Sequence, residues 1–394
     1  MAVRRVAWML LCLLLPIPPA TAQPRVKIGV LTNIGAVFSA YAGHGSVDAA
    51  RLAIEDAGMN GKAELVFADH QNNPELGVAI ARDWFDEQSV DAIFDVPTSA
   101  VALAVNALAG EKRRLVFFST PITDRLTGED CNGYGIGWTW DVYSVAHSAT
   151  LTQMRQGMKT WFIIAQDYPG GQLIEAMIRQ TVEANGGQVI GVARHPLGET
   201  EYASYLEEAK ASNAQFIAFT SGGRDLSSAI GQLREPDATE PGQHFGMMYT
   251  TITEVNLAGI AVLQGLEFAT AFYWDRDNAS RAFALRFYAV HKAMPTMFQA
   301  GVYSAVLNYL RAVRATGSTK AQTVRNWLQN TPIEDAFARN GRLLPNGRFI
   351  HDMLLARIKA PQASHAPWDY YEITGTVPAA EAFRSVADSG CKLK

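Results

Sequence analysis

Short apolar runs rich in β-branched and aromatic residues alternate along the chain with segments whose apolar residues recur at helical spacing. The apolar runs predict strands at 26–32, 65–68, 92–95, 115–119, 160–165, 188–193, 215–220, 245–249 and 265–268. Helical spacing predicts helices at 46–56, 75–87, 99–110, 171–185, 201–211 and 225–234. Such alternation is typical of parallel sheets with helices on both faces, so the pattern predicts an α/β fold.

The number of predicted strands is too large for one sheet of this kind, and it predicts two lobes. A length of 394 residues fits two domains of ordinary size, each with a sizeable core. No Pro/Ser-rich linker separates two halves of the chain. We therefore expect lobes connected by several crossing segments rather than by one flexible linker.

The first residues have the three parts of an export signal. Arg4 and Arg5 precede an apolar run at 6–15, and Ala20-Thr21-Ala22 is a small-residue cleavage site. The apolar run is about half of the roughly 20 residues that cross a bilayer, which disfavours a membrane anchor. We predict that residues 1–22 are a signal peptide that is removed on export.

The formal net charge of −4 at pH 7 argues against nucleic acid and anionic membranes as partners. After cleavage only Cys131 and Cys391 are left, and in an oxidising compartment two cysteines most simply form one disulfide. Metal binding is the weaker alternative because no CxxC or nearby His pair completes a four-ligand site. A catalytic thiol is weaker still.

Catalytic motifs are missing from the sequence. Ser221-Gly222-Gly223 is not a G-x-S-x-G elbow, no H-E-x-x-H occurs, and the eight histidines are scattered. We therefore expect no enzyme activity, no metal and no cofactor.

The run at 272–313, and above all its centre 294–305 (MPTMFQAGVYSA), resembles the branched-chain-amino-acid-type periplasmic binding proteins. These are the type I solute receptors of ABC importers. The resemblance extends to 31–46 (LTNIGAVFSAYAGHGS), to 95–105 (DVPTSAVALAV) and to the final SGCKLK, whose family counterpart closes in a similar way. It covers nearly all of the chain after the predicted signal peptide.

The resemblance implies a periplasmic monomer of two Rossmann-like lobes with parallel sheets, joined by three hinge crossovers near 140–144, 272–276 and 346–351. We therefore expect one lobe from 23–141 plus 275–348 and the other from 142–274 plus 349–385. A tail at 386–394 would be tied down by the disulfide. The lobes would close on a small-molecule ligand, and the permease subunits of an ABC importer would recognise the closed form.

In open α/β sheets, ligands bind at the carboxyl ends of the strands. At such ends the resemblance implies an aromatic ligand contact at Tyr41 and hydroxyl or backbone contacts at Thr98, Ser99, Ala100 and Thr123. Packing between the lobes is the alternative role of Tyr41, and helix N-capping is the alternative role of Ser99. Free N–H groups at the start of a helix suit a carboxylate.

Further candidates are aromatic and polar residues at predicted strand ends and crossovers, where flat ring faces suit a flat ligand. They are Trp140, Tyr143, Tyr168, Ser221 and Tyr273. Packing at the hinge is the alternative role of the aromatic residues.

One departure from the family pattern concerns ligand class. Members that bind amino acids place an acidic residue on a second-lobe loop, and here Thr251 stands at that position. Glu254 lies nearby, but we expect it to open the following helix. Because a buried ammonium without an anionic partner costs several kcal/mol, the pattern favours an aromatic or other hydrophobic carboxylic acid. A receptor for branched-chain amino acids or amides, and a sensing module for a membrane signalling protein, are the alternatives.

Overall fold

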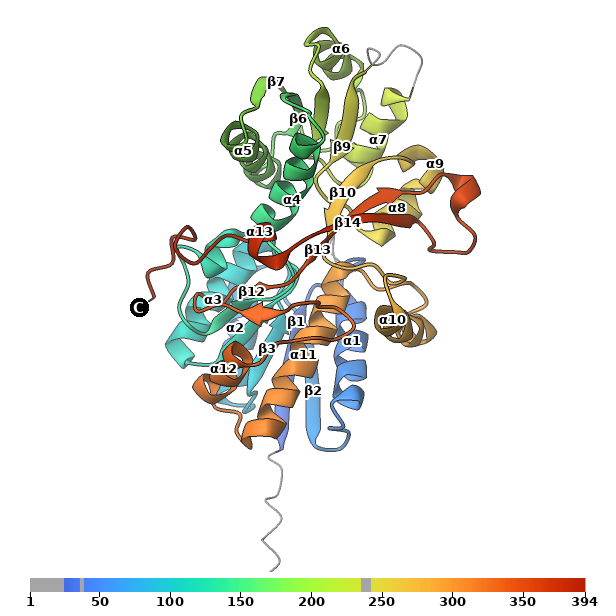
Figure 1. Cartoon of the computed structure of the whole chain (residues 1–394). Helices are drawn as coiled ribbons and strands as arrows, with labels where there is room; N and C mark the ends of the chain where they lie inside the picture. The colour runs from blue at the N-terminus through green and yellow to red at the C-terminus, as the bar shows by residue number, and fades with distance from the viewer. Residues whose placement is uncertain (1–24, 36–38, 235–241, 394) are drawn as a thin grey trace, which may run out of the picture.

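The computed structural model describes residues 25–35, 39–234 and 242–393, so the predicted signal peptide lies outside the described residues. The chain forms two lobes, one built mainly from the N-terminal segments and one from the middle segments (Figure 1). Among the described residues, no helix is long and apolar enough to cross a membrane.

The first lobe contains a parallel five-stranded sheet in the order β2-β1-β3-β4-β5. Its strands are β1 (Val26–Thr32), β2 (Ala63–Asp69), β3 (Ala92–Asp95), β4 (Leu115–Phe118) and β5 (Gly135–Gly137). Side chains alternate between the two faces of a strand, and both faces of β3 and β4 are buried. This explains why these two strands are continuous apolar runs in the sequence.

Helices cover both faces of this sheet. They are α1 (Gly43–Asp56), α2 (Pro74–Asp86), α3 (Ser99–Lys112), α10 (Asn278–His291), α11 (Met297–Thr316) and α12 (Ala321–Asn330). Phe94 and Phe117 belong to one core cluster with residues of α1 and α11, whereas Ile93 and Val116 belong to another with residues of α2 and α3. The two clusters lie on opposite faces of the sheet, as expected for the predicted α/β fold.

The second lobe has a parallel four-stranded sheet in the order β7-β6-β8-β9. Its strands are β6 (Thr160–Gln166), β7 (Gln188–His195), β8 (Phe216–Phe219) and β9 (His244–Met247). The accompanying helices are α4 (Val142–Arg155), α5 (Pro169–Ala184), α6 (Ala203–Ala211), α7 (Gly223–Leu233), α8 (Ile252–Ala258) and α9 (Ile260–Leu263).

A third sheet is antiparallel and was not predicted. β10 (Glu267–Thr270) pairs with β13 (Met353–Ile358), which pairs with β14 (Tyr371–Val377). The strand predicted at 265–268 therefore exists, but its pairing differs from the parallel pairing expected from the strand–helix alternation. The remaining short elements are β11 (Arg342–Leu343), β12 (Phe349–Ile350), α13 (Ala379–Ala382) and the 3₁₀ turns η1 (Asp124–Thr127) and η2 (Pro361–Ala363).

The chain passes between the lobes before α4, after β10 and after β12, which are the three predicted crossovers (Figure 1). The first and third are bonded to each other. Arg348 donates from Nη1 to the Trp140 carbonyl at 2.7 Å and forms a buried ion pair with Asp141 at 3.2 Å. His351 Nε2 lies 2.7 Å from the Thr139 carbonyl oxygen.

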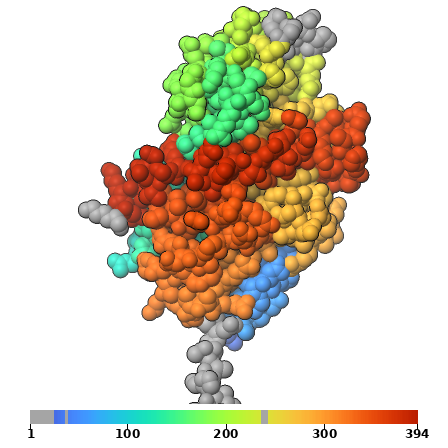
Figure 2. Space-filling view, in the orientation of Figure 1, coloured from blue at the N-terminus to red at the C-terminus, as the bar shows by residue number. Residues whose placement is uncertain are grey.

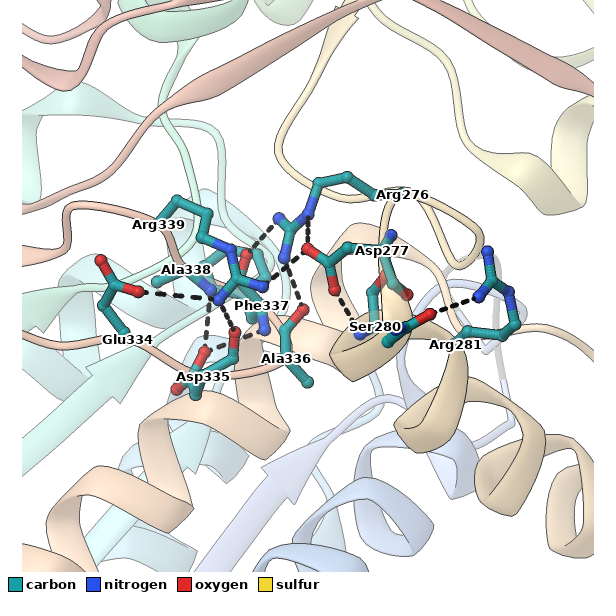
Figure 3. Close-up of polar contacts among 11 residues, drawn as sticks. Arg276, Asp277, Ser280, Arg281, Glu334, Asp335, Ala336, Phe337, Ala338 and Arg339 are labelled. Carbon is teal, nitrogen blue, oxygen red and sulfur yellow. Dashed lines mark hydrogen bonds and ion pairs between the residues drawn. The ribbon is translucent and has the colours of Figure 1, made fainter.

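The second crossover is fixed to the first lobe by arginines (Figure 3). Arg276 donates to the backbone carbonyls of Ala336 and Phe337, and both Arg276 and Arg339 pair with Asp277. Asp277 also caps α10 through the Ser280 N–H. These hydrogen bonds and ion pairs hold the pKa of Asp277 well below its usual range, although burial acts in the opposite direction.

The C-terminal tail connects both lobes. Cys131 and Cys391 form a disulfide, as the sequence predicts. Arg384 pairs with Asp124 of η1 at 3.1 Å, and its guanidinium lies 4.9 Å from the ring centre of Tyr143 on α4. Figure 2 shows the C-terminal segments, in red, as a band across the waist between the lobes. The residue limits given above for each lobe stay predictions.

Candidate ligand-binding site between the lobes

A direct hydrogen bond joins the lobes at Tyr41, in the loop between β1 and α1. The Tyr41 hydroxyl donates to Glu254 Oε1 of α8 at 3.1 Å. The Thr296 hydroxyl donates to the Tyr41 backbone carbonyl at 3.0 Å and holds the loop against α11. Burial, with the neighbouring Glu254 charge, raises the pKa of Tyr41 above its usual range, so the phenol keeps its proton and stays a donor.

Glu254 has two roles in this geometry. It opens α8 as the third residue of a capping box with Thr251, as the sequence predicts. Its carboxylate also accepts from the Gly223 N–H at 3.1 Å and the Thr250 hydroxyl at 3.1 Å. Sequence reasoning placed the second-lobe contact at Thr251. The structure shows that Glu254, one turn further on, brings a carboxylate to the interlobe contact.

Aromatic rings from both lobes surround this contact. The ring centre of Phe298 lies 6.3 Å from that of Tyr41 and 5.1 Å from that of Trp140. Tyr249 of the second lobe lies 4.9 Å from Trp140. The indole N–H of Trp140 donates to the Thr120 carbonyl at 3.0 Å, which fixes the ring on the loop after β4. Tyr41 and Trp140 are sequence-predicted members of this aromatic cluster; Tyr249 and Phe298 were missed.

The other three predicted aromatic residues lie in different surroundings. Tyr143 stacks on His147 and lies under Arg384 of the tail. Tyr168 is the N-cap residue of α5 and is half exposed. Tyr273 stacks on Tyr371 in the second-lobe core, although it also lines a small recess together with Thr251 and Thr296.

The first turn of α3 supplies N–H groups at the carboxyl edge of the first sheet. Ser99 was the expected N-cap, but the structure places Thr98 there, with φ of 68°, and Ser99 and Ala100 follow as the first helical residues. The Thr98 hydroxyl makes no cap, and its oxygen is buried without a hydrogen-bond partner. Thr123 caps η1 by accepting from the Arg125 N–H at 3.3 Å.

A buried acid that sequence reasoning did not single out lies beneath these loops. Asp95 ends β3 and accepts from the Thr32 hydroxyl at 2.7 Å and the Thr120 hydroxyl at 2.6 Å. Burial raises its pKa above the usual range, although the hydroxyl donors act in the opposite direction. Asp95 therefore ties the loop after β1, which carries Tyr41, to the loop after β4, whose Thr120 carbonyl accepts from the Trp140 indole N–H.

Ser221 follows β8 in the second lobe and is fully buried. Its hydroxyl oxygen lies 2.7 Å from His195 Nε2 at the end of β7. The neighbouring Gly223 N–H contacts Glu254, so this loop adjoins the interlobe contact. Sequence reasoning included Ser221 but did not single out His195, which the structure buries completely.

Among the described residues, no group of three or more His, Cys, Asp or Glu side chains is arranged to hold a metal ion. The site instead offers helix N–H groups, aromatic faces and carboxylate and hydroxyl acceptors. Such a set suits an organic molecule held by hydrogen bonds and ring contacts.

Residues 25–364 match the family model described as periplasmic binding protein. No curated protein matches the chain. A periplasmic ligand-binding protein of a branched chain amino acid ABC transporter from Burkholderia xenovorans LB400 is 43% identical, with a TM-score of 0.90 over 93% of this chain and 99% of that chain. A Burkholderia mallei periplasmic binding protein is 36% identical, with a TM-score of 0.83 over 94% of this chain and 100% of that chain.

A solute-binding protein from Rhodopseudomonas palustris, solved with benzoate, is 16% identical and shares the fold with a TM-score of 0.77 over 93% of this chain and 99% of that chain. The family match and the 43% identical relative both extend over most of the chain. The chain therefore belongs to the periplasmic binding protein family.

Proposed function

We propose that the protein binds an aromatic carboxylic acid between its lobes and delivers it to an ABC permease. The observation that carries this proposal is the aromatic cluster of Tyr41, Trp140, Tyr249 and Phe298, contributed by both lobes. A flat ligand ring inserted among these side chains would contact both lobes at once and so favour the closed form.

The carboxylate of this ligand would lie at the start of α3. The N–H groups of Ser99 and Ala100 are free of intrahelical partners by their position in the first turn, and the helix dipole favours an anion there. The unpartnered Thr98 hydroxyl supplies a further donor. Trp140 is bonded to the Thr120 carbonyl, and Thr120 is bonded to Asp95, three residues before Thr98. This chain of contacts links the aromatic cluster to the proposed carboxylate end.

A branched-chain amino acid is the second candidate because Glu254 brings a carboxylate to the interlobe contact. An α-ammonium in place of the Tyr41 hydroxyl would form a charge-assisted hydrogen bond there. The 43% identical protein from Burkholderia xenovorans belongs to a branched chain amino acid transporter. An amide, or a sensing role for the same closure, would use the same two lobes.

Calorimetry on refolded, ligand-stripped protein separates these candidates. We expect a benzoate or cinnamate to bind more tightly than leucine or valine. We also expect Trp140→Ala to weaken aromatic-acid binding by about 1–3 kcal/mol, the range of a buried aromatic contact. Phe216→Leu, at the amino end of β8 where the ring packs on Trp161, is the control and should leave affinity unchanged. Tighter binding of leucine than of every aromatic acid would refute the aromatic assignment.

A further inference from the structure

His195 and Ser221 form a small polar network in the second lobe, next to the interlobe contact. Its geometry determines which of the two residues donates the hydrogen bond between them. His195 ends β7 and Ser221 follows β8, so both lie at the carboxyl edge of the sheet, on either side of β6. His195 Nδ1 lies 2.9 Å from the Pro196 carbonyl oxygen, and Nε2 lies 2.7 Å from Ser221 Oγ. Both residues are buried, so no bulk water competes for these contacts.

The chemistry of the partners fixes the protons. A carbonyl oxygen only accepts, so the Nδ1 contact with Pro196 requires a hydrogen on Nδ1. In a neutral imidazole the other nitrogen is then an acceptor, and the Ser221 hydroxyl must donate its only hydrogen to Nε2. The Tyr202 hydroxyl lies 3.4 Å from Nδ1 and also hydrogen-bonds with Ser221. It does not change this assignment, because its oxygen can accept a second branch of the Nδ1–H bond while its own hydrogen goes to a lone pair of Ser221.

We propose that His195 determines ligand specificity by positioning the Ser221 hydroxyl. Because Ser221 donates its only hydrogen to His195, it can only accept a hydrogen bond from the ligand. With its hydrogen held by His195, Ser221 has only lone pairs left for a further contact. Glu254, contacted through Gly223 of the same loop, is also acceptor-only as a carboxylate. The second-lobe side thus offers acceptors, whereas the α3 side of the first lobe offers donors.

The ligand class that fits this polarity is a carboxylic acid with a hydrogen-bond donor, such as a hydroxyl, at the end opposite its carboxylate. This inference rests on the proposed function, because it assumes that the carboxylate lies at α3. In the structure the Tyr41 hydroxyl of the first lobe donates to Glu254. A ligand hydroxyl would supply the same kind of donor to the second-lobe acceptors.

The test compares 4-hydroxybenzoate with 4-methoxybenzoate, which lacks the donor, by calorimetry. We expect wild-type protein to prefer the hydroxy compound by about tenfold or more, as for an acceptor left without its partner. In His195→Leu the Ser221 hydroxyl is free to rotate and donate, so this preference should fall several-fold. His195→Gln keeps an acceptor oxygen near Ser221 and should restore much of it. His147→Leu, a histidine change elsewhere in the second lobe, should leave the ratio at its wild-type value.

A folded His195→Leu variant with an unchanged ratio would overturn the proposal, since a merely structural role alters both affinities alike. Nitrogen chemical shifts of the His195 ring in the free protein provide a check that needs no ligand. A hydrogen on Nδ1 and none on Nε2 supports the proposal, and the reverse tautomer overturns it. If wild-type protein binds no benzoate at all, the proposed function is wrong, and the ring tautomer still decides the role of His195.

Discussion

Replacing Tyr41 with Phe tests whether the interlobe hydrogen bond controls closure of the ligand-free protein. The change removes the hydroxyl that donates to Glu254 at 3.1 Å but keeps the ring beside Phe298. A hydrogen bond to a charged group contributes about 1.5–3 kcal/mol. Because its two partners belong to different lobes, this free energy enters the equilibrium between open and closed forms, and not the folding of either lobe. We therefore expect the closed-to-open ratio to fall by about 10- to 150-fold.

Small-angle scattering or a fluorescence distance between labels on the two lobes would measure this ratio without ligand. Tyr303→Phe is the matched control, because its hydroxyl also donates to a carboxylate, Asp56 at 2.6 Å, but entirely within the first lobe. The control should lower thermal stability and leave closure unchanged, whereas Tyr41→Phe should open the protein with little loss of thermal stability. If both variants lose stability and neither opens, the interlobe bond has no role in closure.

Three further substitutions address burial, charge and covalent connection. Asp95 has a raised pKa in the folded state, so its protonated form favours folding, and this stabilisation is lost as pH rises through that pKa. Asp95→Asn should therefore raise the free energy of unfolding in urea at pH 7, and this gain should shrink towards acid pH. Arg348→Met leaves the Asp141 carboxylate buried without its cationic partner and should lower the unfolding free energy in urea by about 3–5 kcal/mol. Arg357→Met, at the more exposed pair with Glu267, is the control and should lower it by less than about 1 kcal/mol. Cys391→Ser removes a crosslink with a sequence separation of 260 and should lower the unfolding free energy, by no more than roughly 5–6 kcal/mol from chain entropy, while hydrogen exchange in the tail increases.

The central strands of the parallel sheets could be predicted from the sequence because they are buried on both faces. β1 and β3 have the predicted limits, since each is an apolar run that ends where the chain turns into a loop at the carboxyl edge. The antiparallel strands β13 and β14 were not predicted. In β14, buried residues lie only at the two ends, so its sequence lacks the continuous apolar run of the other strands. Its pairing with β13 is specified by tertiary contacts, to which a local pattern does not respond.

The site shows a similar division. Thr98, Ser99 and Tyr41 were predicted from the family resemblance and from strand ends and helix starts, which are visible in the sequence, and their contact with a ligand stays a prediction. The capping box at Thr251 and Glu254 was also visible, but it specified only where α8 begins. The contact that gives Glu254 its second role joins residues 213 positions apart. His195 ends β7 and Ser221, 26 positions later, follows β8, and only the strand order brings their side chains together.

The arrangement of donors and acceptors suggests how such a site could select its ligand. Glu254 is already paired with Tyr41 across the two lobes, so a ligand that contacts this carboxylate gains only the difference between two hydrogen bonds. A ligand that separates the pair without offering a donor leaves a buried carboxylate short of one partner, which costs more than one good hydrogen bond contributes. On the proposed function, selection would then come mainly from rejecting molecules that lack a donor at that end. The aromatic cluster would supply most of the affinity for molecules that have one.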